Sequence, residues 1–349
     1  KNFHVQNWAK TLDTYLQRYR IDTGKSVHTS ATCRVVFATD LGSLLEEKSE
    51  AKSDQNAVSA VLKTRVALKI MKNYDEFRRE IISRYGTSSE PLDDCTIGLI
   101  GWHISNDTKS ISLNELRESH ERSERTDSQE QEEYVLVMEM GSASLFHEMT
   151  SQRIAGHDVD KVQTIFKKIV QQVQRLHGHN LIHSDIKPRN ILFVPSANFE
   201  DENITLCDLD AALEIGTERP FDLKSSTAYC PPEFAQFKFA QGPAPIMTAK
   251  FDIWSLGVLL FELCSGQNMF FQDISDDNMT SELDVKRLCL WNCITDQELL
   301  LVFDDNKEAK DLIRWCLRGD PTERPTIEQI LQHPFVTGVQ DDTLLKQRM

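Results

Sequence analysis

An acid, a lysine and an amide lie within six positions of one another in LIHSDIKPRNILF, residues 181–193. A carboxylate such as Asp185 can orient a hydroxyl group and accept its proton. The ammonium group of Lys187 can neutralise an anion, and Asn190 offers an oxygen ligand of the kind that suits Mg²⁺. Asp208, in LCDLD, adds a carboxylate for the same ion. These four groups could act together if the fold brings them to one place.

The segments on either side of this stretch are strongly patterned. Apolar residues recur at i, i+3 and i+4 through residues 160–180, which predicts a long helix with a buried face. The run NILFV after the stretch is strand-like. Residues 251–266, FDIWSLGVLLFELCSG, are nearly all apolar and predict a core helix. The stretch itself should therefore be a loop between a helix and a strand.

The first part of the chain is predicted to be mostly β. Strand-like runs occupy residues 32–41, 63–71, 95–104 and 134–140, and residues 74–86 predict one helix that Gly86 ends. A β-rich first part and an α-rich second part indicate an α+β chain with two lobes and a cleft between them.

Two segments of the first part have a different composition. Residues 105–133 are rich in Ser, Arg, Glu and Gln, and are predicted to be a long, mostly disordered insertion. Residues 3–19 carry apolar side chains at helical spacing. They predict an amphipathic helix that packs on its own domain or docks an upstream segment.

Charge and cysteine usage limit the partners and the compartment. The net charge of −15 disfavours nucleic acid as a partner. The eight cysteines form no CxxC pair, so we expect buried thiols in a reducing, intracellular and cytoplasmic setting. No stretch has the run of about 18 apolar residues that a membrane span needs. The chain starts with Lys, which is typical of a domain from a longer protein or of a processed chain.

Six motifs occur in an order and spacing that resemble the eukaryotic protein kinase family of the Ser/Thr type: VALKIMK, HSDIKPRN, CDLD, PPE, DIWSLGV and ERP. The resemblance covers roughly residues 25–336. It implies a bilobal kinase fold that binds ATP and Mg²⁺ and phosphorylates a protein substrate. The implied organisation is a helical extension at 1–24, an N-lobe at 25–138, a hinge at 139–143 and a C-lobe at 144–349.

Lys69 lies in the apolar strand VALKIMK, where an unpaired ammonium group would be costly. By the resemblance, its partners would be the ATP phosphates and a helix glutamate. Glu80 is our choice, and Glu76, one helical turn earlier, stays open. Arg84 stands where such helices usually carry an apolar residue.

The resemblance also implies the remaining site residues. Met138 would be the gatekeeper, and the base would bind through the Glu139 carbonyl and the Gly141 N–H. The other nucleotide contacts would come from Ser30, Cys33, Val35 and Ala67. Structural roles would fall to His183, Glu233, Asp252 and Arg324.

Besides Arg84, the sequence departs from the family pattern at three further places. No glycine run precedes the lysine strand, and Ser30 and Cys33 stand at two of the glycine positions. Ser184 replaces the arginine before the catalytic acid, so activity should not depend on a phosphorylated activation loop. Asp210 replaces the glycine that the family places two residues after Asp208. It could be a surface or capping residue, or a third acid near the metal. Residues 225–227 could be phosphorylated, or could simply be turn hydroxyls.

These departures keep a second function open, a pseudokinase that binds nucleotide as a regulatory or scaffold module. A small-molecule kinase on a related fold is less favoured, because PPE, DIWSLGV and ERP resemble motifs of the lobe that binds protein substrates.

Overall fold

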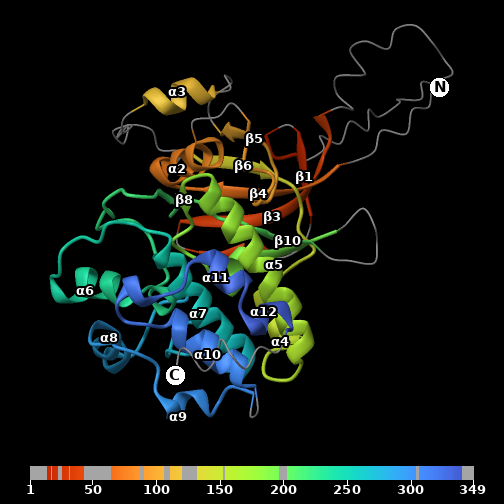
Figure 1. Ribbon diagram of the computed structural model, residues 1–349. Coiled ribbons are helices and arrows are strands. Elements are labelled where there is room, and N and C mark those ends of the chain that lie inside the picture. The colour runs from red at the N-terminus through yellow and green to blue at the C-terminus, as the bar shows by residue number, and fades with distance from the viewer. Residues whose placement is uncertain are drawn as a thin grey trace, which may run out of the picture. The chain divides into compact units, whose positions relative to one another are not determined.

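The structure is a computed structural model that describes residues 14–16, 18–22, 26–30, 32–42, 64–86, 90–105, 111–119, 132–151, 154–195, 203–303 and 306–339. Contacts between Cα atoms divide the chain into two compact units (Figure 1). The first unit comprises residues 1–73, 99–111 and 123–140, and the second comprises residues 74–98, 112–122 and 141–349. The lobe and hinge boundaries that the sequence suggests remain predictions.

The first unit contains one antiparallel sheet with the strand order β1-β3-β4-β6-β5, and β2 pairs with β3. The strands are β1 (Tyr19–Ile21), β2 (His28–Thr29), β3 (Cys33–Asp40), β4 (Arg65–Met71), β5 (Leu99–Ile104) and β6 (Tyr134–Met138). The strands predicted from VVFA, VALKI, LIGWHI and YVLVM are confirmed.

The two faces of this sheet carry different residues, because successive side chains of a strand point to opposite faces. One face is apolar and includes Val36, Leu68 and Val137, which pack with Tyr19. The register pairs Val35 with Lys69, and Ala67 with Met138. Directly paired residues share a face, so these four side chains lie on the face opposite the apolar cluster.

The second unit is mainly helical. Its helices are α2 (Tyr74–Tyr85), α3 (Leu113–Glu118), α4 (Leu145–Ser151), α5 (Val159–Gly178), α6 (Pro232–Ala240), α7 (Lys250–Ser265), α8 (Glu282–Cys289), α9 (Asp296–Leu299), α10 (Lys307–Cys316), α11 (Ile327–Leu331) and α12 (Pro334–Thr337). Its short strands are β7 (Ala143–Ser144), β8 (Leu181–Ile182), β9 (Ile191–Val194), β10 (Asn203–Leu206) and β11 (Leu213–Glu214), and its 3₁₀ turns are η1 (Pro188–Asn190), η2 (Thr227–Tyr229) and η3 (Pro321–Glu323).

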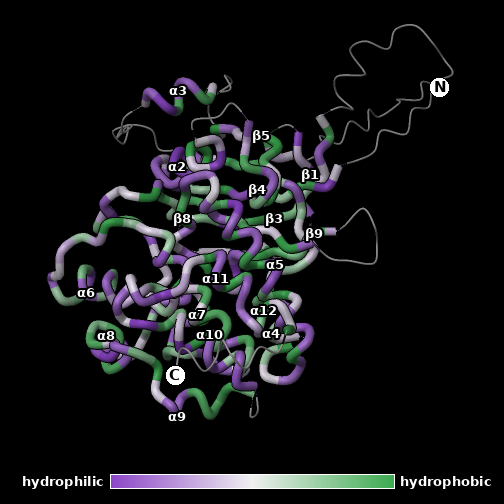
Figure 2. The backbone as a smooth tube through the Cα atoms, in the orientation of Figure 1, coloured by the Kyte–Doolittle hydropathy of each residue, from purple (hydrophilic) through white to green (hydrophobic). Residues whose placement is uncertain are grey.

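The core of this unit forms around α7, whose residues from Phe251 to Cys264 are all buried. Figure 1 shows α5 and α10 beside it, and Figure 2 shows the hydrophobic character of α7 itself. Helix α5 begins at the cap Asp158 and buries every apolar residue of its predicted stripe. Both helix predictions are confirmed, as is α2, which ends before Gly86 in a left-handed conformation (φ +52°).

Two local predictions need correction. Most of the helix predicted for residues 3–19 lies outside the described residues, but its end is wrong because Tyr19 starts strand β1. The insertion predicted to be mostly disordered contains helix α3. Ser112 and Glu115 form a reciprocal capping box there, which offsets the low apolar content, and Leu116 is fully buried.

Candidate active site

The catalytic-loop candidates lie between β8 and β9, and three of them share one cluster of contacts. The Nζ atom of Lys187 is 3.3 Å from Oδ2 of Asp185. Asn190 donates through Nδ2 to the Asp185 backbone carbonyl at 2.9 Å and to Oδ2 of the same residue at 3.1 Å. Asp185 is only 5% exposed and Lys187 only 8%. The three polar groups of the opening motif therefore form one buried unit, joined by an ion pair and two hydrogen bonds.

Asp252 of α7 supports the backbone of this loop. Its two carboxylate oxygens accept the N–H groups of His183 and Ser184, both at 2.9 Å. Ser184 has φ +56°, a conformation that is uncommon for a residue with a side chain. Two charge-assisted hydrogen bonds to a fully buried carboxylate stabilise this turn. The structural role that the resemblance implied for Asp252 remains a prediction, and these two hydrogen bonds support it.

Main-chain contacts place Cys207, the residue before Asp208, beside Asn190. The Cys207 N–H donates to the Asn190 carbonyl at 3.0 Å, and the His183 ring lies 3.1 Å from the Cys207 carbonyl. Asp208 follows with φ +68° and is half-buried. The amide nitrogen of Asn190 is engaged by Asp185, so its oxygen is the atom left to ligate a cation.

The charges around Asp185 favour its ionised form. Burial raises the pKa of this carboxyl and so does Asp208, but the ammonium group of Lys187 and the Ser226 N–H lower it, and the net pKa lies below its usual value. Burial alone would lower the pKa of Lys187. The carboxylates of Asp185, Asp277 and Asp208 outweigh burial, and the pKa is raised. At neutral pH the acid is thus a carboxylate and the lysine an ammonium ion.

Ser226 connects the activation segment, residues 208–233, to Asp185 and Lys187. Its N–H donates to Oδ1 of Asp185 at 3.0 Å, and its hydroxyl accepts from Nζ of Lys187 at 2.6 Å. Ser226 and its neighbours Ser225 and Thr227 are all buried. A kinase acting on any of these three hydroxyls would first have to open the segment. Their modification remains a prediction.

Ser184 and Asp210 fill the places of the arginine and the glycine of the family pattern. The Ser184 hydroxyl donates to the Ala211 carbonyl. Asp210 is buried rather than on the surface, and its carboxylate is 3.3 Å from the Lys224 ammonium group. Arg79 of α2 donates to the Asp210 carbonyl at 3.2 Å. The activation segment is therefore held by side chains of the chain itself.

Glu233 and Arg324 form a two-point ion pair, with N–O distances of 2.9 and 2.7 Å. Arg324 also donates to the carbonyls of Arg318, Gly319 and Lys250, and is almost fully buried. The pair joins the end of the activation segment to the turn before α11.

Lys69 is only 4% exposed and lies on the same sheet face as Val35, Ala67 and Met138. In the other unit, Glu80 is fully buried in α2 and accepts from Nη2 of Arg84 at 2.8 Å. Arg84, which is unusual for the family at this position, thus forms an ion pair with the buried Glu80 carboxylate. The pairing of Lys69 with Glu80 or Glu76 remains a prediction.

The loop in place of the glycine run is a tight turn between β2 and β3. Ser30 donates its N–H to the Cys33 carbonyl at 2.8 Å, and the Ser30 hydroxyl accepts the Cys33 N–H at 3.2 Å. The pairing of His28 with Val35 fixes the register of this hairpin. One N–H group that a glycine loop could offer to a phosphate is therefore already used.

The hinge candidates Glu139 and Gly141 differ in exposure and in the space around them. The Glu139 side chain is exposed, so only its backbone is suited to recognition of a buried base. At Gly141 an added Cβ would lie 3.3 Å from the Phe193 carbonyl, which is tighter than ordinary packing. Glycine is thus favoured at position 141 because a side chain there would have little room.

Sequence reasoning missed Asp277. Its Oδ2 is 3.1 Å from Nζ of Lys187 and its Oδ1 is 3.2 Å from Nε of Arg189. It is one of several acids in the polar stretch DISDDNMTSELD, and no spacing rule separates it from the others. Only the tertiary contact identifies it.

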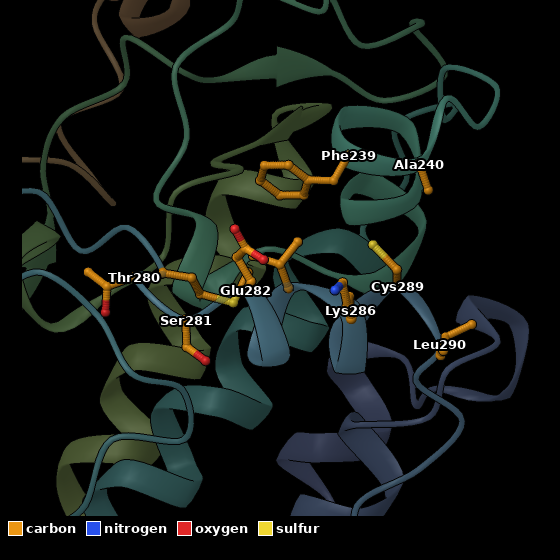
Figure 3. Close-up of a pocket in the computed structure, with 10 residues that line it drawn as sticks. Phe239, Ala240, Thr280, Ser281, Glu282, Lys286, Cys289 and Leu290 are labelled. Atoms are coloured by element: carbon orange, nitrogen blue, oxygen red, sulfur yellow. The ribbon is translucent and has the colours of Figure 1, made fainter.

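A groove of about 490 Å³ between α6 and α8 lies apart from these residues (Figure 3). Phe239 and Ala240 line it from α6, and Lys286 and Cys289 line it from α8. None of the candidate catalytic residues contributes to its lining.

Within the described ranges, no three His, Cys, Asp or Glu side chains are grouped as a metal site. A Mg²⁺ ion commonly needs just one or two protein ligands when substrate phosphates supply the rest, so Asn190 and Asp208 suit it. Among the helices that the structure describes, none is long and apolar enough to cross a membrane.

Comparison with known proteins agrees with this geometry. The family model described as "Protein kinase domain" matches residues 116–336. The chain is 28% identical to the human SNF-related serine/threonine-protein kinase over 58% of its length, and 33% identical to the calcium/calmodulin-dependent protein kinase cmkA of Emericella nidulans over 51%. It is 30% identical to calcium-dependent protein kinase 14 of Arabidopsis thaliana over 58%. The chain belongs to the protein kinase family, and its fold class is α+β, as the resemblance implied.

The matched regions are only part of those relatives. They cover 24% of the human protein, 39% of the Emericella protein and 34% of the Arabidopsis protein.

Proposed function

We propose that the chain is an ATP-dependent Ser/Thr protein kinase that transfers the γ-phosphoryl group of ATP to hydroxyl groups of protein substrates. The observation that carries the proposal is the buried contact cluster of Asp185, Lys187 and Ser226. Phosphoryl transfer depends on positioned charges more than on covalent catalysis, and this cluster supplies them.

In the proposed reaction, Asp185 orients the substrate hydroxyl and receives its proton. The substrate oxygen bonds to the γ-phosphorus, the bond from that phosphorus to the bridging oxygen breaks, and ADP leaves. Lys187 neutralises charge on the transferring group. Asn190 and Asp208 would hold Mg²⁺, which when bound would neutralise charge on the phosphates.

Binding of the nucleotide is assigned to the first unit and the residues that follow it. Lys69 would bind the phosphates, and Val35, Ala67 and Met138 would contact the adenine from the same sheet face. The Glu139 carbonyl and the Gly141 N–H would bind the base edge. Ser30 and Cys33 would lie over the phosphates.

Activity is proposed to be independent of activation-loop phosphorylation. Asp210 and Lys224 are within ion-pair distance, and Ser184 is bonded to the Ala211 carbonyl. These contacts connect the loop to its surroundings where the family usually relies on an arginine and a phosphate.

One observation favours a second candidate, a pseudokinase that binds nucleotide without efficient transfer. The Ser30 hydroxyl already occupies the Cys33 N–H, so the turn has fewer donors for a phosphate. Such a module would use the same protein surfaces in regulation or as a scaffold.

A transfer assay separates the two candidates. The purified chain is incubated with labelled ATP, Mg²⁺ and a generic protein substrate, beside Asp185→Asn, a variant of nearly the same shape. We expect Mg²⁺-dependent label transfer by the wild type and a loss on the order of 10²-fold or more in the variant. Equal signals from the two proteins would reject the kinase and favour the pseudokinase.

A further inference from the structure

The segment between α7 and α8 contains a turn, residues 272–279, that reaches the catalytic loop. Asp277 is at its centre with φ +58°, and it is only 4% exposed. The Asp277 N–H donates to the Asp273 carbonyl at 3.0 Å, and the Asp273 N–H donates to the Asn278 carbonyl at 2.8 Å. The turn is therefore organised by its own backbone.

The carboxylate of Asp277 lies between two cations of the catalytic loop. Its oxygens are 3.1 Å from Nζ of Lys187 and 3.2 Å from Nε of Arg189. Arg189 is held in turn, since its Nη2 donates to the Ile274 carbonyl and its guanidinium lies 3.8 Å from the centre of the Phe146 ring. A buried carboxylate requires such partners, because an uncompensated charge would be costly.

The backbone of the same turn contacts the activation segment. The Ala228 N–H donates to the Asp277 carbonyl at 3.3 Å, and the Thr227 N–H donates to Oδ1 of Asn278 at 3.1 Å. The Met279 N–H donates to the Thr227 hydroxyl at 2.8 Å. Three hydrogen bonds thus connect the turn to the residues that directly follow Ser226.

Lys187 is consequently held from three directions: by Asp185 of its own loop, by Ser226 and by Asp277. Removing the Asp277 charge would leave the first two contacts and free the ammonium group on one side. A displacement of about 1 Å in a catalytic group can lower the rate by about 10²-fold. The position of Lys187 is therefore sensitive to Asp277.

We propose that Asp277 is a positioning residue that holds the Lys187 ammonium group beside Asp185 and Ser226. The proposal rests on the proposed kinase function for its effect on rate, but the ion pair itself can be tested without activity. Asp277 acts through Lys187 and does not touch substrate.

The test combines kinetics with a double-mutant cycle on the full chain. Asp277→Asn removes the charge, keeps the shape and suits a left-handed backbone. Asp273→Asn is the matched control in the same turn, because the Asp273 carboxylate is exposed and accepts from the N–H and hydroxyl of Ser275 rather than from the catalytic loop. We expect Asp277→Asn to lower kcat on the order of 10- to 100-fold with little change in KM for ATP, and the control to match the wild type.

The cycle uses thermal unfolding of the wild type, Asp277→Asn, Lys187→Met and the double variant. If the two groups interact, the Tm of the double variant lies above the value obtained by adding the two single changes in Tm. Additive changes, or a kcat of Asp277→Asn equal to that of the control, would overturn the proposal. If the wild type is inactive but the changes in Tm are non-additive, the kinase function is rejected, and with it any effect of Asp277 on rate. The ion pair of Asp277 with Lys187 is then still supported.

Discussion

The ammonium group of Lys187 donates a hydrogen bond to the hydroxyl of Ser226 at 2.6 Å. This contact joins the catalytic loop to the activation segment without a phosphate group. Since the Ser226 N–H also binds Asp185, one activation-segment residue positions both charged groups of the loop. Substitutions of the groups that surround this arrangement should therefore affect activity and stability in different ways.

Loss of Lys69 or Asp208 should abolish transfer and leave the fold intact. Lys69→Met removes the proposed phosphate partner, and Asp208→Asn removes the charge of a proposed Mg²⁺ ligand. We expect activity to fall on the order of 10³-fold in each, because the charges that stabilise the transition state are lost. Activity and Tm are measured in parallel, with the exposed neighbour Lys72→Met as control. A large drop in Tm for either variant would mean that the residue is structural.

Restoring glycine in the β2–β3 turn should strengthen nucleotide binding. Ser30→Gly removes the hydroxyl that accepts the Cys33 N–H, and Cys33→Gly allows left-handed conformations. A freed N–H that binds a phosphate should raise ATP affinity by roughly tenfold, which corresponds to about 1.4 kcal/mol. Calorimetry on both variants, with Ser26→Gly outside the turn as control, measures this. An unaltered affinity would place the phosphates elsewhere.

Arg84 should be needed for stability because it compensates a buried charge. In α2, Arg84→Met would deprive the Glu80 carboxylate of the Arg84 cation, and losing one partner of a buried pair costs roughly 3–5 kcal/mol. Chemical denaturation should show this decrease in the free energy of unfolding. The double variant with Glu80→Gln should recover part of it. No recovery would mean that Arg84 acts through its bond to the Ile97 carbonyl at 2.6 Å.

Glu262 should make stability depend on pH. This fully buried residue of α7 accepts from the Tyr229 hydroxyl at 2.7 Å, and burial raises its pKa from 4.5 to about 8. Since the folded pKa lies above the unfolded one, its stabilising contribution is complete below about pH 4.5 and is lost as pH rises to about 8.

The measurement is the free energy of unfolding at several pH values for the wild type and Glu262→Gln. Gln keeps an acceptor for Tyr229 but does not titrate. A difference of one pKa unit between the folded and unfolded states corresponds to about 1.4 kcal/mol of stability. Across this pH range, the free energy of unfolding of the wild type should therefore fall by a few kcal/mol relative to that of the variant. Parallel profiles would show that Glu262 is not protonated in the folded protein at neutral pH.

The order of the elements and the local motif could be predicted from sequence because both depend on local patterns. The stripe of α5 and the apolar run of α7 needed only periodicity, and HSDIKPRN needed only spacing. The end of the N-terminal helix was mispredicted because Tyr15 and Tyr19, four apart, satisfy helical spacing, whereas Tyr15 forms an isolated β-bridge with Tyr19, the first residue of β1. Helix α3 had a readable signal in its capping box, which the surrounding polar residues obscured.

Other contacts are not set by local patterns, and the pair of Glu233 with Arg324 was expected only through the family resemblance. Asp277 contacts Lys187, which is about 90 residues away in the sequence. Asp210 contacts Lys224 because of the path that the activation segment follows between them. Burial decides these pairings, since a buried charge must find a partner wherever the chain supplies one.

The most direct test of the proposed phosphoryl transfer is a crystal structure of the chain with a non-hydrolysable ATP analogue and Mg²⁺. We expect the ion to be coordinated by the Asn190 amide oxygen and the Asp208 carboxylate, the Lys69 ammonium group to contact the phosphates, and Asp185 to face the γ-phosphate. Crystals that bind no nucleotide, or that show these four side chains directed away from it, would contradict the proposed reaction.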